Sequence, residues 1–133
     1  GEPDPRANSN SLVLEGQWQG HRILLTGDIE AATEQHLAET GRLTRCAIMK
    51  SPHHGSQTSS TPVLLRSVDP SLVLISSGSP WRFNHPSPRV IARLESRGIP
   101  NLTTHQHGEI LVQFHRPGFR LAFPGPEITP VSH

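Results

Sequence analysis

The residues best suited to chemistry are two adjacent histidines, His53 and His54, in a polar loop that runs from Lys50 to Ser60. Because neighbouring side chains point in different directions, one imidazole can ligate a metal ion while the other donates a proton or contacts an anion. The pair is followed by Gly55, which allows another backbone to approach closely. The loop predicts metal-dependent acid–base chemistry, in which either histidine could be the ligand and the other the catalytic group. The alternative is a polar loop with capping hydroxyls.

Three hydroxyl side chains follow the histidine pair, at Ser56, Thr58 and Ser59. Hydroxyl groups close to the amides of a helix N-terminus suit the binding of a phosphate group. We therefore expect these three residues to bind substrate.

Two other loops carry candidate side chains. Asp28 follows Gly27, and its carboxylate can bind a metal ion or cap the next helix. Arg82 and Asn84 lie among aromatic residues and prolines and are expected to contact substrate, with His85 beside them as a catalytic candidate. The alternative for this third loop is a purely structural role.

Regular elements expected to position these loops alternate between strands and helices along the chain. Strands are expected at 11–14, 22–26, 46–50, 72–75, 101–103, 109–114 and 119–123, the first two joined by a turn at 16–20. Helices are expected after Asp28, Thr61-Pro62 and Ser87-Pro88. The order predicts an α/β fold, a mixed β-sheet with about three helices on one face. The three polar loops follow successive central strands, where α/β proteins place their sites.

The composition fits one modest domain. With 13 prolines and 11 glycines in 133 residues, the elements must be short, which excludes a helical bundle. We expect a single domain over 1–123 and a proline-rich tail over 124–133. The 12 Lys and Arg nearly balance the 11 Asp and Glu, so net charge indicates no nucleic-acid partner. The single cysteine, Cys46, is expected to be buried, and no apolar run approaches the roughly 20 residues of a membrane helix, so the piece is expected to be soluble.

Four segments, in this order, closely resemble the C-terminal metallo-β-lactamase-like domain of the ComEC family of competence proteins. They are Asn10-Ser11-Leu12-Val13-Leu14, Leu24-Leu25-Thr26-Gly27-Asp28-Ile29-Glu30, Lys50-Ser51-Pro52-His53-His54-Gly55-Ser56 and Asn84-His85-Pro86-Ser87-Pro88. The resemblance implies half of an αββα sandwich, belonging to a metal-dependent phosphodiesterase that acts as a DNA nuclease. It also implies two divalent ions, zinc or manganese, and single-stranded DNA as a partner.

The same resemblance implies roles for individual residues. Asp28 matches a ligand that bridges two metal ions, and one of His53 and His54 matches a terminal ligand. We favour His54 as the ligand and His53 as the acid or phosphate contact, and the reverse stays open. His85 matches a histidine near the site that is either a ligand or a substrate-binding residue. The parent protein implied is a channel in the bacterial inner membrane, whose membrane portion is a further partner.

The chain departs from the family in one important motif. The principal metal motif, His-x-His-x-Asp-His, does not occur in the sequence, and the nearest match, His105-Gln106-His107, is expected to be a turn. A catalytic zinc site takes about three protein ligands besides water. We therefore expect this piece to bind metal weakly or not at all and to be inactive. The N-terminal half of the same domain is then an expected partner.

Loss of that half is also expected to expose one face of the sheet. We therefore expect the chain to self-associate through this face. The residues expected there, in some combination, are Leu12, Leu14, Ile23, Leu25, Ile48, Leu72 and Leu74.

On the third helix, Arg89, Arg93 and Arg97 either follow a phosphate backbone or form an ordinary solvated face. Two other functions stay open: a non-catalytic module that binds DNA or the channel, and a hydrolase of another ester.

Overall fold

A five-stranded sheet forms the centre of the chain. The computed structural model describes residues 11–78, 85–116, 118–124 and 131–132. The strands lie in sequence order: β1 (Leu14–Trp18), β2 (His21–Leu25), β3 (Ile48–Lys50), β4 (Leu72–Ile75) and β5 (Asn101–Thr103). β1 runs antiparallel to β2, and the other neighbours are parallel. The predicted α/β fold with a mixed sheet is confirmed.

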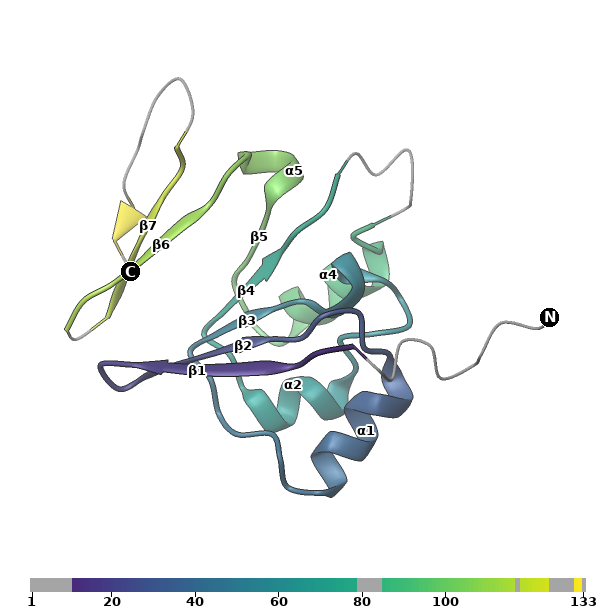
Figure 1. The fold of residues 1–133 in the computed structure, drawn as a ribbon. Coiled ribbons are helices and arrows are strands. Elements are labelled where there is room, and N and C mark those ends of the chain that lie inside the picture. The colour runs from purple at the N-terminus through teal and green to yellow at the C-terminus, as the bar shows by residue number, and fades with distance from the viewer. Residues whose placement is uncertain (1–10, 79–84, 117, 125–130, 133) are drawn as a thin grey trace.

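Helices α1 (Ala31–Glu39), α2 (Pro62–Val68) and α4 (Pro88–Ser96) cover one face of this sheet (Figure 1). The predicted caps are confirmed, because Thr61 and Ser87 each accept a hydrogen bond from a backbone amide of the first helical turn. The core of this layer joins strands to helices α2 and α4. Its buried members include Leu24, Met49, Val73, Ile75, Leu64, Leu65, Val68, Val90 and Leu94.

A second, three-stranded sheet covers part of the opposite face. It consists of β6 (Leu111–Phe114), β7 (Phe119–Ala122) and β8 (Val131–Ser132), in that order. Leu121 of β7 packs with Ile48 and Leu72 of the central sheet, and all three are buried. The chain therefore has three layers: helices, sheet and sheet (Figure 1). β8 extends the second sheet into the segment predicted as a tail.

The predicted open face of the sheet is only partly correct. Exposure of Ile48 and Leu72 was wrong, because the second sheet buries both of them. Leu12, Leu14 and Leu25 are exposed, as expected, with exposed fractions of 70%, 49% and 45%. An apolar patch thus remains beside the hairpin of β1 and β2.

The turn of this hairpin also differs from the prediction. The chain reverses at Gln19 and Gly20 alone, with Trp18 opposite His21. Both turn residues have positive φ angles, 47° and 85°. A two-residue turn of this kind matches the twist of the flanking strands, so the strand continues through the predicted loop.

The segment His105-Gln106-His107 forms a short helix rather than a turn. In α5 (Thr104–His107), the hydroxyl of Thr103 caps the amide of Gln106, and the ring of His107 lies 5.0 Å from that of Phe123. Packing against an aromatic ring accounts for His107 without a metal ion.

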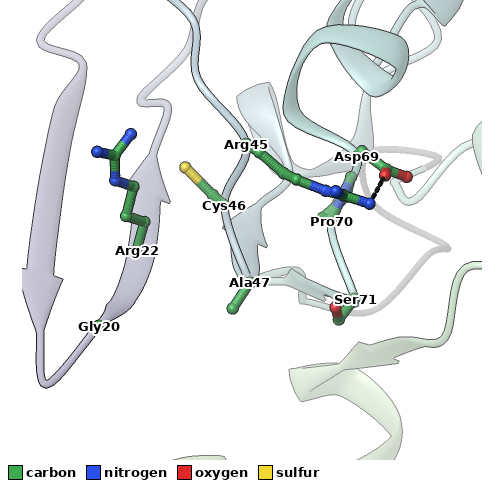
Figure 2. A pocket seen from close by; sticks show the side chains of 8 residues that line it. All are labelled: Gly20, Arg22, Arg45, Cys46, Ala47, Asp69, Pro70 and Ser71. Carbon is green, nitrogen blue, oxygen red and sulfur yellow. Dashed lines mark hydrogen bonds and ion pairs between the residues drawn. The ribbon is translucent and has the colours of Figure 1, made fainter.

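A wide hollow of about 570 Å³ lies at the edge of the sheet where β3 and β4 begin (Figure 2). Its arginines are already paired with acidic side chains, Arg22 with Glu15 and Arg45 with Asp69. Cys46, which also lines it, is buried, as predicted. Among the described helices, none combines the length and the apolar character that a bilayer crossing requires.

Candidate metal-binding site

Three loops meet at the edge of the sheet where β2, β3 and β4 end. The carbonyl of Gly27, in the first loop, accepts a hydrogen bond of 2.9 Å from the amide of His53 in the second. The carbonyl of Gly55, in the second loop, accepts a bond of 2.8 Å from the amide of Ser87 after the third. Carboxyl ends of parallel strands share one edge, and the predicted meeting of these loops is confirmed.

Gly55 allows the second and third loops to pack closely. A Cβ atom at this position would lie 2.8 Å from the Cβ of Pro86 and 3.3 Å from Cγ2 of Ile75. Its φ angle of +78° also lies in the region that glycine alone adopts readily. Pro86, which follows His85 at the end of the third loop, is therefore held directly against Gly55, next to the histidine pair.

The backbone of the histidine pair is strained. In the short segment η2 (Pro52–Gly55), His53 has a φ of 50° and His54 a φ of 55°. Left-handed backbone costs a residue with a Cβ atom roughly 1–2 kcal/mol. Glycine or asparagine would fit these positions with less strain, so the imidazoles themselves account for the choice of residue.

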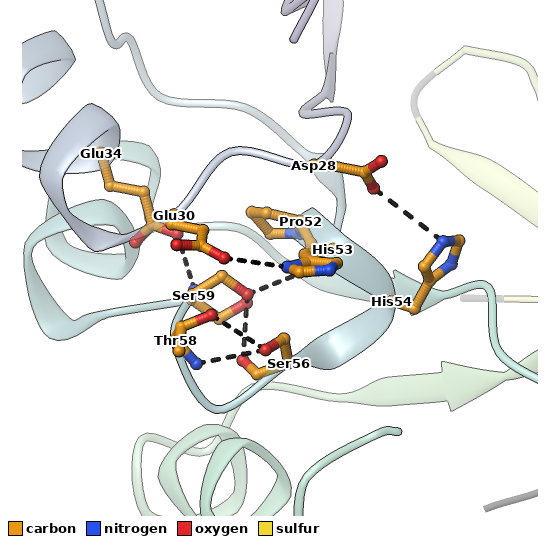
Figure 3. A network of polar contacts seen from close by, with 10 residues as sticks. Asp28, Glu30, Glu34, Pro52, His53, His54, Ser56, Thr58 and Ser59 are labelled. Atoms are coloured by element: carbon orange, nitrogen blue, oxygen red, sulfur yellow. Dashed lines mark hydrogen bonds and ion pairs between the residues drawn. The ribbon is translucent and has the colours of Figure 1, made fainter. Parts of the chain in front are cut away.

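The two imidazoles point in different directions, as predicted from their adjacency, and each faces a carboxylate. Figure 3 shows His54 directed toward Asp28 and His53 toward Glu30. Their ring centroids lie 6.5 Å apart with an angle of 61° between the planes. The loop therefore offers two separate imidazole functions rather than one.

The two ring nitrogens of His54 have different surroundings. Its Nδ1 lies 2.7 Å from the carbonyl oxygen of Ser76, at the end of β4. A carbonyl only accepts hydrogen bonds, so Nδ1 carries a proton, and a lone pair in the ring can lie only on Nε2. Nε2 lies 3.9 Å from Oδ1 of Asp28. A lone pair and a carboxylate that face each other are suited to sharing a cation.

His53 faces a carboxylate that the sequence analysis did not select. Its Nδ1 lies 3.4 Å from Oε1 of Glu30 and makes no hydrogen bond within the described parts of the chain. The contact becomes an ion pair when His53 is protonated. Glu30 follows Asp28 by two residues at the start of α1, where an acidic residue is ordinary, so its type alone gave no signal.

His85 lies beside His53, with the ring centroids 5.6 Å apart. Burial lowers the pKa of His85 below the ordinary value of histidine, and His53 and His54 lower it further by charge repulsion. The imidazole of His85 therefore stays neutral at pH values where an ordinary histidine is already protonated.

We expect an NMR titration of this chain to show His85 protonating at lower pH than a histidine in an unstructured peptide. His53→Gln removes one repelling charge and should raise the pKa of His85 part of the way back. Because the unfolded chain binds this proton more readily, some stability is lost as pH falls from the ordinary pKa toward that of His85. A midpoint equal to that of the peptide would contradict the geometry.

The candidate substrate-binding hydroxyls differ in accessibility. Thr58 is exposed, and its hydroxyl pairs with that of the buried Ser56 at 2.9 Å. The buried hydroxyl of Ser59 donates to the carbonyls of Pro52 and Ser56. Ser59 thus supports the loop, and its contact with substrate stays a prediction. Arg82 and Asn84 lie outside the described residues.

The described residues contain no complete cluster of metal ligands. Within 11–78, 85–116 and 118–124, no group of three or more histidine, cysteine or acidic side chains is arranged to hold a metal ion. The facing pair of Asp28 and His54 provides two possible ligands.

Comparison with known proteins places the chain beside much longer ones. No protein-family model matches it. It is 33% identical to ComE operon protein 3 of Bacillus subtilis over 113 residues, which are 84% of this chain and 15% of that protein. It is 38% identical to Recombination protein 2 of Haemophilus influenzae over 109 residues, 80% of this chain and 13% of that protein.

A third relative, Competence protein ComA of Neisseria gonorrhoeae, is 32% identical over 114 residues, 85% of this chain and 16% of the relative. The chain thus spans between 13% and 16% of the length of these three proteins. These three homologues are therefore proteins named for the ComE operon, for recombination and for competence, and the chain corresponds to one short segment of each.

Proposed function

We propose that this chain is the C-terminal half of a metallo-β-lactamase-like domain in a DNA-uptake protein of the ComEC family. We further propose that the complete domain is a metal-dependent phosphodiesterase that cleaves single-stranded DNA. The names of the homologues support the setting in DNA uptake. The helix, sheet and sheet layers are consistent with most of an αββα sandwich.

The orientation of His54 is the observation that carries the proposal. The carbonyl of Ser76 holds the proton on Nδ1, which leaves Nε2 facing the carboxylate of Asp28. The side chains of His54 and Asp28 are 49% and 52% exposed, so an ion could reach the space between them. These residues therefore fit part of a site for divalent ions, zinc or manganese.

Each residue at the site would have a separate role in hydrolysis. Bound divalent ions would supply charge stabilisation of a phosphodiester and activation of water. Asp28 and His54 would hold them. His53 would donate a proton to the leaving oxygen, oriented by Glu30 at its other nitrogen. The neutral His85 beside it would avoid adding positive charge next to this acid.

The missing ligands would come from the N-terminal half of the same domain, in a protein several times longer than this chain. That half would also cover the exposed Leu14 and Leu25. Where it is absent, the same patch would support self-association. The rest of the parent would be a channel in the bacterial inner membrane that passes single-stranded DNA.

The test is cleavage of single-stranded DNA by the full-length protein with Mn²⁺ or Zn²⁺. Asp28→Asn should lower the rate more than about 100-fold, because it removes a metal ligand. Asp69→Asn is the matched control, since Asp69 is an exposed carboxylate at the opposite edge of the sheet. Equal rates in the two variants would refute the site. DNA binding without any cleavage would identify a binding module instead.

A further inference from the structure

A buried carboxylate lies next to the histidine loop. Glu34, in the middle of α1, is completely inaccessible to solvent. A buried charge is costly unless it is fully hydrogen-bonded. Its two oxygens accept bonds from the amide of Ser60 at 2.7 Å, the amide of Thr61 at 2.8 Å and the hydroxyl of Thr61 at 2.6 Å. Three hydrogen bonds therefore attach α1 to one point of the histidine loop, where the loop leads into α2.

An arginine from another helix reaches the same point. Nη1 of Arg93, in α4, donates to the carbonyl of Ser60 at 2.7 Å and lies 3.5 Å from that of Ser59. Ser60 is thus bound at its amide by Glu34 and at its carbonyl by Arg93. Its φ angle of 54° is unusual for serine, and these two bonds hold it there. We call this arrangement the Ser60 clamp.

The Ser60 clamp connects directly to the start of the histidine segment. The hydroxyl of Ser60 lies 2.8 Å from that of Ser51, and the hydroxyl of Ser59 donates to the carbonyl of Pro52 at 2.9 Å. Ser51 and Pro52 immediately precede the histidine pair. Moving Ser60 would therefore move the backbone from which His53 and His54 project.

The Ser60 clamp also connects to Asp28. Glu34 lies on α1, the helix that begins just after Asp28, and the amide of Ala31 in its first turn donates to the carbonyl of Thr58 at 2.8 Å. α1 therefore touches the loop at two points. The two segments that carry Asp28 and His54 are held in register by these hydrogen bonds.

Capping of α2 explains only part of the arrangement. The hydroxyl of Thr61 caps that helix, Pro62 begins it, and Glu34 binds both the amide and the hydroxyl of Thr61. The third bond of Glu34 goes to the amide of Ser60, and Arg93 binds the carbonyls of Ser59 and Ser60, which precede the helix. Both side chains therefore meet at Ser60, which lies between the histidine loop and the helix.

We infer that Glu34 and Arg93 are positioning residues, which set the separation between Asp28 and His54 and thereby the affinity for metal. The inference rests on the proposed function. Neither residue would touch metal or substrate. Arg93 would accordingly hold the histidine loop. Of the three arginines named on the third helix, Arg89 and Arg97 would remain for any contact with DNA.

The test is Mn²⁺ affinity of the full-length protein, measured by electron paramagnetic resonance. Glu34→Gln keeps the volume but turns an amide group toward backbone donors, and should lower the affinity about 10–100-fold, as supporting contacts of metal ligands do. Val68→Ala is the matched control, because Val68 is equally buried at the far end of α2. It should lower the melting temperature and leave the affinity unchanged.

Variants of Arg93 give an independent test, because they leave the buried carboxylate of Glu34 in place. Arg93→Lys keeps a donor for the carbonyl of Ser60 and should retain most of the affinity that Arg93→Met loses. Unchanged affinity in both Glu34→Gln and Arg93→Met, with Asp28→Asn abolishing binding, would overturn the inference alone. Unchanged affinity in Asp28→Asn would overturn the proposed function and the inference together.

Discussion

Gly27→Ala is expected to lower the free energy of unfolding of this chain by about 3 kcal/mol. A Cβ atom there would lie 2.8 Å from the backbone oxygen of Leu12 and 3.2 Å from the Cβ of Ser11. The φ angle of +57° adds strain of roughly 1–2 kcal/mol, and overpacking adds roughly 1–3 kcal/mol. Because the carbonyl of Gly27 binds the amide of His53, the histidine loop should shift as well.

Urea denaturation measures this loss, and Gly41→Ala is its matched control. Gly41 has a similar φ angle of +70° but no atom within 4 Å of the added Cβ. The control should therefore lose only the strain, about 1 kcal/mol. Equal losses in the two variants would mean that close packing against Leu12 contributes nothing.

His54→Gly should separate function from stability more sharply than any other change at the site. Relief of left-handed strain and loss of the bond to Ser76 are of similar size, so the free energy of unfolding should change by less than about 1 kcal/mol. In the full-length protein, Mn²⁺ affinity should fall more than about 100-fold, because a metal ligand is lost. Denaturation and metal titration provide the two measurements.

Gln19→Gly is the control for strain relief. Gln19 also has a positive φ angle, 47°, but it lies in the exposed hairpin turn far along the chain from the site. This variant should gain about 0.5–1 kcal/mol of stability and bind Mn²⁺ as before. A loss of several kcal/mol in His54→Gly, with affinity retained, would show that His54 is a structural residue.

The order of strands and helices could be predicted from the sequence because each element carries its own signal. The caps at Thr61 and Ser87 and the apolar run of β4 are local features, and all three are confirmed. The hairpin turn was misplaced because Gly16 resembled the start of a loop. It lies within β1, opposite Ile23.

The cover on the sheet could not be predicted, because it depends on contacts distant in sequence. Ile48 and Leu72 are buried by Leu121, far along the chain. No local pattern in β3 or β4 indicates which partner would cover them. Leu12, Leu14 and Leu25 remain exposed because the second sheet covers only part of the central one. How far the second sheet extends is decided by tertiary packing.

The ligand candidates of the site were accessible to sequence reasoning, whereas their supports were not. Asp28, His53 and His54 follow strands, and a histidine pair in such a loop is rarely needed for structure alone. Glu30 and Glu34 lie in a helix where acidic residues normally face water. Only the folding of the histidine loop over α1 buries Glu34 and directs Glu30 to His53.

The sequential strand order of the central sheet has a consequence for the order of folding. Every strand from β2 to β5 pairs with the strand that precedes it in the chain, so each pairing closes a short segment. Asp28, the histidine pair and His85 all precede β6. During synthesis, the site loops therefore emerge before the hairpin that shields the sheet.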